Sequence, residues 1–200
     1  MENKYKYIYT ERGEKISGLL LLEPNIFHDE RGFFFESWNK KNFQKLLENE
    51  NQKNYEFVQE NHSKSKKGVI RGLHFQRDPY AQGKLVKCIS GLIFDVVLDL
   101  RKESKTFGKW AGITLSSDNL NQLWIPRGFA HGFLTLSNIA EVFYKTTNFW
   151  CKEYEMSILW RDNNINIKWP LEKLNSQLVI NQKDKNAPSL SEIKTEFLFK

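Results

Sequence analysis

The chain has 200 residues, enough for one domain with a sizeable core, and a formal net charge of +6. Acidic residues are interspersed among the lysines and arginines, whereas nucleic-acid-binding proteins gather their basic residues on one stripe. We therefore interpret the charge mainly as a contribution to solubility that still permits an anionic ligand, and we expect no nucleic-acid partner. The sequence has no run of about 18 apolar residues, so no membrane span and no membrane partner are predicted.

The cellular compartment is predicted from the N-terminal residues and the cysteines. Residues 1–15 contain no apolar run of the kind that a secretory signal needs. Cys88 and Cys151 have neither CxxC spacing nor the density of a disulfide framework. We therefore expect a cytoplasmic protein with two free thiols.

The first part of the chain predicts short strands and one helix. The expected strands cover residues 1–16 (an edge strand or an ordered arm), 16–23 and 33–38. A turn is expected at residues 29–32. Residues 39–51 predict a helix, because Phe43, Leu46 and Leu47 recur at helical spacing opposite lysines and glutamates.

From residue 57 onward, short apolar segments alternate with turns rich in Gly, Pro and Asn. The expected strands cover residues 57–61, 68–76, 85–89, 92–100, 106–115, 122–125, 132–137 and 140–149, with a basic turn at 63–68. Closely spaced strands without βαβ alternation predict a mainly β sandwich or barrel and argue against a Rossmann domain. Residues 151–200 are turn-rich and should pack on the barrel as short helices or loops.

The segment 92–100 alternates in a way that predicts a strand with one dry face and one polar face. Its even positions are apolar, and Asp95 and Asp99 share the opposite face. We expect Asp99 to form an ion pair with Arg101 or neighbouring lysines. Asp95 could face a pocket and orient Lys84.

Four polar features stand out among the strands. They are RGLH with Arg71 and His74, Lys84 at the start of the next strand, FAHGF with His131, and VFYKTT with Tyr144. Strict alternation places Arg71 and His74 on opposite faces of their strand. Both can line one pocket only if Gly72 marks a bulge or twist.

A metal site is one alternative interpretation of the histidines. Metal-binding double-stranded barrels usually carry two histidines at i and i+2, but the i+2 partner of His74 is Gln76. His62 lies on the far side of the basic turn. The sequence also lacks a GxSxG nucleophile elbow and a GxxxxGK[ST] phosphate loop. These patterns favour neither a metal nor a covalent nucleophile.

Histidine, lysine and tyrosine in one barrel suit the abstraction of a proton next to a carbonyl group. A histidine can act as the base because its pKa lies near neutrality. A lysine or a second histidine can stabilise the enolate oxygen as charge develops. A tyrosine on the opposite face can return a proton, and a base and an acid on opposite faces invert a stereocentre.

Together these residues resemble one family, the dTDP-4-dehydrorhamnose 3,5-epimerases, which are metal-free cupins. The resemblance rests on RGLHFQ, FDVVLDLRKES and IPRGFAHGF in this order, and it runs from about Leu19 to Pro188. It implies a single double-stranded β-helix (jelly-roll) cupin domain over residues 1–200 with a few short helices. The N-terminal strands within 1–40 would be shared with a dimer partner, and residues 171–200 would pack on the barrel.

The resemblance also implies roles for individual residues. His74 matches the general base, Tyr144 the proton donor, and Asp184 the carboxylate that pairs with the base, although composition alone makes Asp184 a solvated charge in the tail. The other matches are Lys84 and His131 near the keto oxygen and sugar, Arg31 and Arg71 at the diphosphate, Glu36, Gln59, Glu60 and Asn61 at the nucleoside, and Glu155 and Lys183 as further pocket residues. In a homodimer that exchanges N-terminal strands, Arg31 and Glu36 would reach the neighbour's site.

The implied reaction moves protons at C3 and C5 of dTDP-4-keto-6-deoxy-D-glucose to give dTDP-4-keto-L-rhamnose, without a cofactor. Phe149 and Trp150 stand where the family commonly has two tyrosines, and Glu60 stands where it commonly has Asp. These departures leave open another nucleotide-linked 4-keto sugar as substrate, or action at C3 or C5 only. A sugar-nucleotide-binding cupin without turnover and a metal-dependent cupin oxygenase are the alternatives from other classes.

Overall fold

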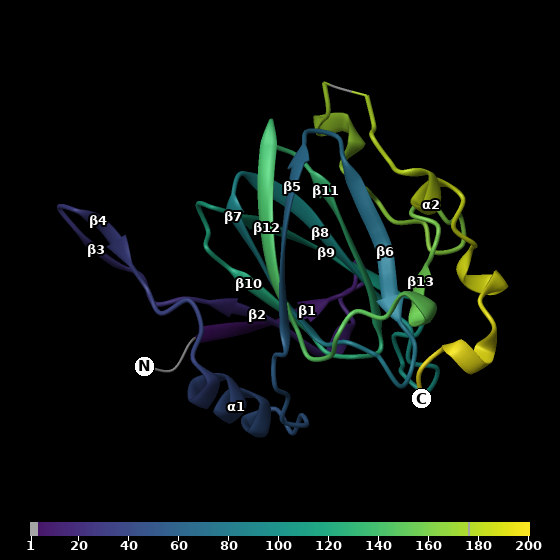
Figure 1. Ribbon diagram of the computed structural model, residues 1–200, viewed down its shortest axis with the longest axis horizontal. Helices are drawn as coiled ribbons and strands as arrows, with labels where there is room; N and C mark the ends of the chain where they lie inside the picture. The colour runs from purple at the N-terminus through teal and green to yellow at the C-terminus, as the bar shows by residue number, and fades with distance from the viewer. Residues whose placement is uncertain (1–3, 176) are drawn as a thin grey trace.

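The computed structural model describes residues 4–175 and 177–200, and its main feature is a pair of antiparallel sheets that face each other (Figure 1). In spatial order, the six-stranded sheet contains β1 (Lys4–Tyr9), β2 (Lys15–Glu23), β10 (Gln122–Ile125), β7 (Lys84–Ser90), β12 (Ile139–Thr146) and β5 (Gln59–Lys66). The five-stranded sheet contains β13 (Glu155–Ser157), β6 (Ile70–Gln76), β11 (Phe129–Thr135), β8 (Leu92–Asp99) and β9 (Trp110–Ser116). The predicted mainly β fold is therefore confirmed.

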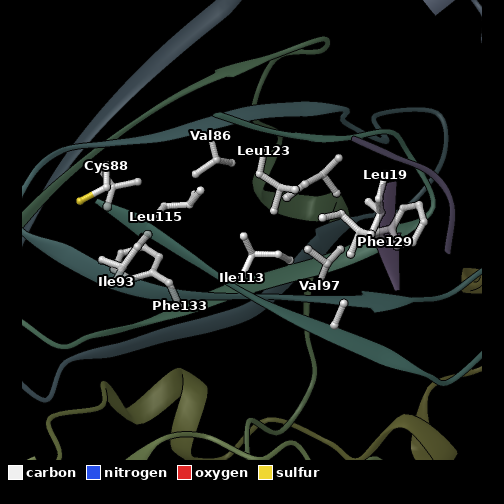
Figure 2. Close-up of a cluster of buried hydrophobic side chains, with 14 of the residues drawn as sticks. Leu19, Val86, Cys88, Ile93, Val97, Ile113, Leu115, Leu123, Phe129 and Phe133 are labelled. Carbon is white, nitrogen blue, oxygen red and sulfur yellow. The ribbon is translucent and has the colours of Figure 1, made fainter. Parts of the chain in front are cut away.

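The main hydrophobic core fills the space between the two sheets. Figure 2 shows Val86 of β7 and Leu123 of β10 in the same cluster as Ile93 of β8 and Ile113 of β9. Each strand sends alternate side chains inward, so both sheets contribute apolar side chains to one buried layer. Removing this surface from water is the main force that holds the sheets together.

A second apolar layer covers the outer face of the five-stranded sheet. Ile165, Trp169, Ile193 and Phe199 from the C-terminal segment are buried in one cluster with side chains of β6, β8 and β11. This segment runs along one side of the sandwich and contains short helices (Figure 1): α2 (Gln182–Lys185) and 3-10 turns at Leu171–Lys173, Leu190–Glu192 and Thr195–Phe197. Another 3-10 turn, Lys152–Tyr154, precedes β13. Among residues 4–175 and 177–200, no helix has the length and apolar character needed to cross a membrane.

Strand β8 differs from the prediction of one dry face and one polar face. Asp95 and Asp99 are both fully buried, because one face of β8 lies in the core between the sheets and the other lies beneath the C-terminal layer. Asp99 forms the expected ion pair with Arg101, whose Nη2 lies 2.7 Å from its Oδ2. The hydroxyls of Ser104 and Thr106 also donate to Asp99. The buried charge is thus compensated locally.

The predicted helix is confirmed as α1 (Lys40–Asn49). Its N-cap is Asn39, whose side chain accepts a hydrogen bond from a backbone N–H in the first turn. Phe43 and Leu47 pack in one cluster with Trp124 of β10. The helix therefore covers part of the outer face of the six-stranded sheet.

Several expected boundaries are wrong. The strand predicted at 33–38 ends at Phe34, the one at 106–115 begins at Trp110 and the one at 140–149 ends at Thr146. The basic turn predicted at 63–68 is mostly strand, because β5 pairs with β12 as far as Lys66. The lysines of this stretch alternate with inward-facing residues along the edge strand. The edge strand expected at 1–16 is present as β1, and residues 1–3 of that prediction lie outside the described residues.

A small hairpin of β3 (Phe27–Asp29) and β4 (Gly32–Phe34) projects away from the sandwich (Figure 1). Phe27, Phe33 and Phe34 are all exposed, with Phe34 exposed by 71%. Large aromatic side chains on a projecting hairpin are typical of a surface that another protein covers.

Strand β6 contains the irregularity that the sequence required at Gly72. His131 of β11 pairs with His74 and Phe133 pairs with Arg71, so β6 has one extra residue between these pairs. Gly72 has φ +115°, and a Cβ at this position would lie 2.7 Å from the carbonyl oxygen of His131. A side chain therefore does not fit here, and the bulge that turns His74 toward the interior depends on glycine.

We predict that Gly72→Ala lowers the free energy of unfolding by about 3 kcal/mol, because the new Cβ meets backbone that cannot move cheaply and φ is positive. Gly13→Ala is the matched control: Gly13 has φ +80°, but a Cβ there meets no described atom within 4 Å. Its cost should be about 1 kcal/mol, from the positive φ alone. Urea unfolding of both variants measures the difference, and equal losses would contradict the steric account.

Candidate active site

The site is centred on a pair formed by His74 of β6 and Asp184 of α2, 110 residues apart in the chain. Nε2 of His74 donates a hydrogen bond to Oδ1 of Asp184 over 2.7 Å. Asp184 is fully buried, whereas the side chain of His74 is 28% exposed. Because Nε2–H binds the carboxylate, the ring nitrogen that can accept a proton is Nδ1.

Two local features fix the carboxylate of Asp184. Asn181 caps α2 by accepting a hydrogen bond from the N–H of Asp184 over 2.7 Å, and its amide donates to Oδ2. The N–H of Gly72 donates to the same Oδ2 over 3.2 Å, so the bulge that directs His74 also binds its partner. Burial raises the pKa of Asp184, but the hydrogen bonds from His74 and Gly72 outweigh burial and hold this pKa below its ordinary value. The carboxylate is therefore ionised at neutral pH.

His74 lines a cavity of about 100 Å3 between the two sheets. The lining residues come from both sheets, from the loop before β7 and from the loop that follows β12; they are Gln59, Asn61, His74, Phe75, Gln76, Gln82, Lys84, Tyr144, Trp150 and Glu155. Tyr144 of β12 belongs to the six-stranded sheet and His74 to the five-stranded sheet, so they reach the cavity from opposite sides. Burial raises the pKa of Tyr144, although the charge of Arg71 acts the other way, so its hydroxyl stays protonated at neutral pH.

Lys84 begins β7 and forms another part of the cavity wall. Burial lowers the pKa of Lys84 to about 8, although the carboxylates of Asp95 and Glu155 act in the opposite direction. The two oxygens of Asp95 lie 3.0 and 2.9 Å from Nε2 of His131. Asp95 was expected to orient Lys84, but it acts on Lys84 only through its charge. The hydrogen-bond partner of Asp95 is His131.

Other predicted site residues surround these groups. Glu155 lines the cavity, and its Oε2 lies 2.5 Å from Nζ of Lys183. Nε of Arg71 donates to Oγ of Ser65 over 3.0 Å, and the charge of Arg71 acts on Tyr144. The bulge thus brings Arg71 and His74 toward the same region. Gln59 and Asn61 lie on β5, at the edge of the six-stranded sheet, and also face the cavity.

Three predicted residues lie elsewhere in the described chain. Arg31 lies at the tip of the projecting hairpin and binds Asp29. Glu36 follows this hairpin and is exposed. Glu60 alternates with its neighbours on β5, so it points to the opposite face of the sheet and pairs with Lys145 over 3.1 Å. Within one chain, these three residues are not part of the cavity.

Gln76 and Gln82 line the cavity, although no sequence pattern had assigned them a role. The i+2 spacing of Gln76 from His74 is the signal that could have placed it, since residues two apart on a strand share a face. For Gln82, in a loop, no comparable signal exists.

The chemistry of the cavity defines a class of protein. Among residues 4–175 and 177–200, no group of three or more His, Cys, Asp or Glu side chains could hold a metal ion. A larger cleft, of about 540 Å3, lies beside Lys15 and Gln52 and is lined by other residues than the His–Asp pair. A His–Asp pair, a half-buried tyrosine and a half-buried lysine around one cavity in a two-sheet β fold are the parts of an enzyme that moves protons by general acid–base catalysis.

Comparison with known proteins identifies the family within this class. The family model of dTDP-4-dehydrorhamnose 3,5-epimerase matches residues 13–192. The dTDP-4-dehydrorhamnose 3,5-epimerase of Salmonella typhimurium strain LT2 is 54% identical over 177 residues, which are 88% of this chain and 93% of the relative. That of Escherichia coli K12 is 51% identical over 179 residues, 90% and 93% of the two chains.

A solved structure agrees with these sequence relatives. The dTDP-6-deoxy-D-glucose-3,5-epimerase of Legionella pneumophila, crystallised in complex with dTDP-4-keto-L-rhamnose, has a TM-score of 0.87 and 43% identity, with 98% of each chain covered. The chain therefore belongs to the dTDP-4-dehydrorhamnose 3,5-epimerase family, and the resemblance found in its motifs is confirmed.

We predict that the amine of Lys84 titrates with a pKa of about 8 and that Asp95→Asn lowers this pKa further, because a negative charge that favours the ammonium form is removed. Glu155→Gln should cause a smaller decrease. NMR titration of lysine side chains, with Lys84→Arg used to assign the signal, measures both. An unchanged pKa in Asp95→Asn would contradict the electrostatic link.

Proposed function

We propose that this protein inverts C3 and C5 of dTDP-4-keto-6-deoxy-D-glucose to give dTDP-4-keto-L-rhamnose. The observation that carries the proposal is the placement of a His–Asp pair and a tyrosine on opposite sides of one cavity. The membership of the chain in the epimerase family supports the choice of substrate. The oxidation state of the sugar does not change, so the reaction requires no redox cofactor.

His74 is the proposed general base. Nδ1 removes the proton from the carbon next to the C4 ketone, and the ionised Asp184 stabilises the imidazolium that forms. The ketone acidifies both C3 and C5, so one base can act twice. Because Asp184 is fixed by the N-cap of α2 and by Gly72, the imidazole keeps one orientation during both steps.

Lys84 is the proposed electrophile for the enolate oxygen at C4. A partly buried ammonium group such as that of Lys84 stabilises developing negative charge more strongly than an exposed one, because the local dielectric constant is lower than in water. His131, held by the buried Asp95, is proposed to contact the sugar from the neighbouring strand. Together they would lower the barrier to proton removal without forming a covalent bond.

Tyr144 is the proposed proton donor. Its hydroxyl reaches the cavity from the sheet opposite His74, so the proton would return to the other face of the sugar ring. Return to the opposite face inverts the carbon, whereas return by His74 itself would restore the substrate. The raised pKa of Tyr144 keeps the hydroxyl protonated and ready to donate at neutral pH.

The nucleotide part of the substrate is proposed to extend from the cavity toward β5 and the loop after β12. Gln59 and Asn61 would contact the nucleoside, and the exposed indole of Trp150 offers a flat surface for the base. Arg71 would bind the diphosphate. Glu155 and Lys183, which pair with each other, are proposed as further contacts near the sugar.

We further propose that the protein works as a homodimer in which the N-terminal strands are exchanged. The exposed aromatic residues on the β3–β4 hairpin and the distance of this hairpin from its own sandwich support the proposal (Figure 1). In such a dimer, Arg31 and Glu36 would reach the partner's nucleotide, and Glu60 would lie near the interface. Cys88 and Cys151 are both free, which fits the proposed cytoplasmic location.

Incubation of the protein with dTDP-4-keto-6-deoxy-D-glucose in D2O, followed by proton NMR of C3 and C5, tests the function. We predict deuterium at both carbons for the natural protein. His74→Ala should slow exchange at least about a hundredfold while dTDP still binds, because only the base is lost. Tyr144→Phe should reduce product more than it reduces the first exchange.

The control for this experiment is His62→Ala. His62 lies on β5 and pairs with Glu141 of β12 over 2.9 Å. In the described chain it does not line the cavity, so the loss of its side chain should leave deuterium exchange unchanged. Near-normal turnover of His74→Ala would contradict the base assignment. Deuterium at one carbon only would replace the proposal with the alternative of a single-carbon epimerase.

A mixture of two inactive variants tests the exchanged dimer. Arg31→Ala and His74→Ala dimers each lack one component in every site. After subunit exchange, a mixed dimer has one intact site if Arg31 serves its neighbour, so a 1:1 mixture should recover about a quarter of the natural activity. If Arg31 serves its own chain, no intact site forms and activity stays at the level of the separate variants.

A further inference from the structure

The loop that follows β12 is held by three glutamine side chains that line the cavity. Nε2 of Gln82 donates to the carbonyl of Asn148 over 2.8 Å, and Oε1 of Gln59 accepts from the N–H of Trp150 over 3.0 Å. Nε2 of Gln76 donates to the carbonyl of Phe149 over 3.0 Å, and its Oε1 accepts from the N–H of residue 151 over 2.6 Å. Backbone groups of four consecutive residues are thus bound to side chains rather than to a neighbouring strand.

Gln76 is the central member of this group. It is 4% exposed, and the second hydrogen of its Nε2 binds the carbonyl of Tyr80 over 2.7 Å. One buried amide therefore joins β6, the loop before β7 and the loop after β12. A neutral imidazole has one donor and one acceptor and could not bind these three backbone groups, whereas a primary amide can. The chemistry of the site thus accounts for a glutamine two residues after His74.

The loop carries an exposed side chain on a fixed backbone. Trp150 is 54% exposed and lines the cavity, while its own N–H and both flanking peptide units are hydrogen-bonded to buried or half-buried side chains. When a flat ligand binds an exposed indole whose backbone is already held, the backbone needs no further ordering, so less conformational entropy is lost on binding. This arrangement suits a platform for an aromatic base.

We propose that Gln76 is a positioning residue that fixes Trp150 at the mouth of the cavity for the base of the nucleotide. The inference rests on the proposed function, because it takes the ligand to be a nucleotide-linked sugar. Gln76 itself would touch neither the reacting carbons nor the protons in transfer. Its effect would pass through the backbone of residues 148–151 to the indole.

A double-mutant cycle on the affinity for dTDP tests the proposal. Trp150→Ala should weaken Kd roughly tenfold through loss of stacking, and Gln76→Met, which keeps the volume and removes the hydrogen bonds, should weaken it by a similar factor. Because both changes remove the same platform, the double variant should bind no more weakly than Trp150→Ala alone. Gln76→Met should also raise KM while kcat stays within about twofold.

Gln52→Met is the matched control. Gln52 also makes two side-chain hydrogen bonds, to the carbonyl of Gly18 and from the indole of Trp124, but it lies beside the other cleft. The Gln52→Met variant should bind dTDP with the Kd of the natural protein, even if its thermal stability is lower. If Gln76→Met does not fold, the same cycle is run with Gln76→Glu, which keeps the acceptor for the N–H of residue 151 and removes both donors.

Two results would overturn the inference. The first is a Kd for dTDP that is unchanged in the Gln76 variant. The second is a double variant whose Kd is weakened roughly a hundredfold, the product of the two single effects, which would mean that Gln76 acts independently of Trp150. Failure of the proposed function is a separate outcome. In that case the natural protein itself would bind no dTDP or exchange no deuterium.

Discussion

The hydrogen bond between His74 and Asp184 is the interaction on which the rest of the site depends. It joins a strand of the sandwich to a short helix 110 residues later, and it places a charged carboxylate at a fully buried position. A buried carboxylate is costly unless it is paired and hydrogen-bonded. The cost is offset here by His74, by the N–H of Gly72 and by the N-cap of α2, so the fold of the C-terminal segment and the orientation of the imidazole are set together.

The two-sheet architecture meets a second requirement of the site, because it places functional groups on opposite sides of the cavity. In the proposed mechanism, a base on one sheet and an acid on the other would face the substrate from opposite sides without any moving part. The bulge at Gly72 makes this possible, because regular alternation would turn either Arg71 or His74 away. The tight approach of Gly72 to β11 shows that this irregularity is built into the packing of the sheet rather than added at its edge.

Local patterns in the sequence predicted much of the fold. The apolar stripe of α1, the alternation of the strands and the need for a break at Gly72 are all properties of neighbouring residues, and the structure confirms each of them. The burial of Asp95 was not predictable in this way, because it depends on the six-stranded sheet that covers the face of β8 shared by Asp95, Ile93 and Val97. The basic stretch before Gly68 reads as a turn until its partner β12 is known.

The residues of the candidate site also fall into those that local sequence patterns predict and those that depend on distant parts of the chain. His74, Lys84 and Tyr144 stand out as polar residues in apolar strands, and they do meet at one cavity. Asp184 lies in a polar tail, and only the resemblance to a family pointed to it before the structure showed the hydrogen bond. Gln76 depends on loops from two distant parts of the chain, so its role could be inferred only from the three backbone groups that it binds.

The proposed mechanism requires the sugar to lie between His74 and Tyr144 with its ketone at Lys84. A crystal structure of Tyr144→Phe with dTDP-4-keto-6-deoxy-D-glucose bound would show whether it does. We expect the hydrogens of C3 and C5 to face Nδ1 of His74, the C4 oxygen to lie within hydrogen-bond distance of Nζ of Lys84, and the base to stack on Trp150. A sugar ring bound outside the cavity, or one whose ketone points away from Lys84, would contradict it.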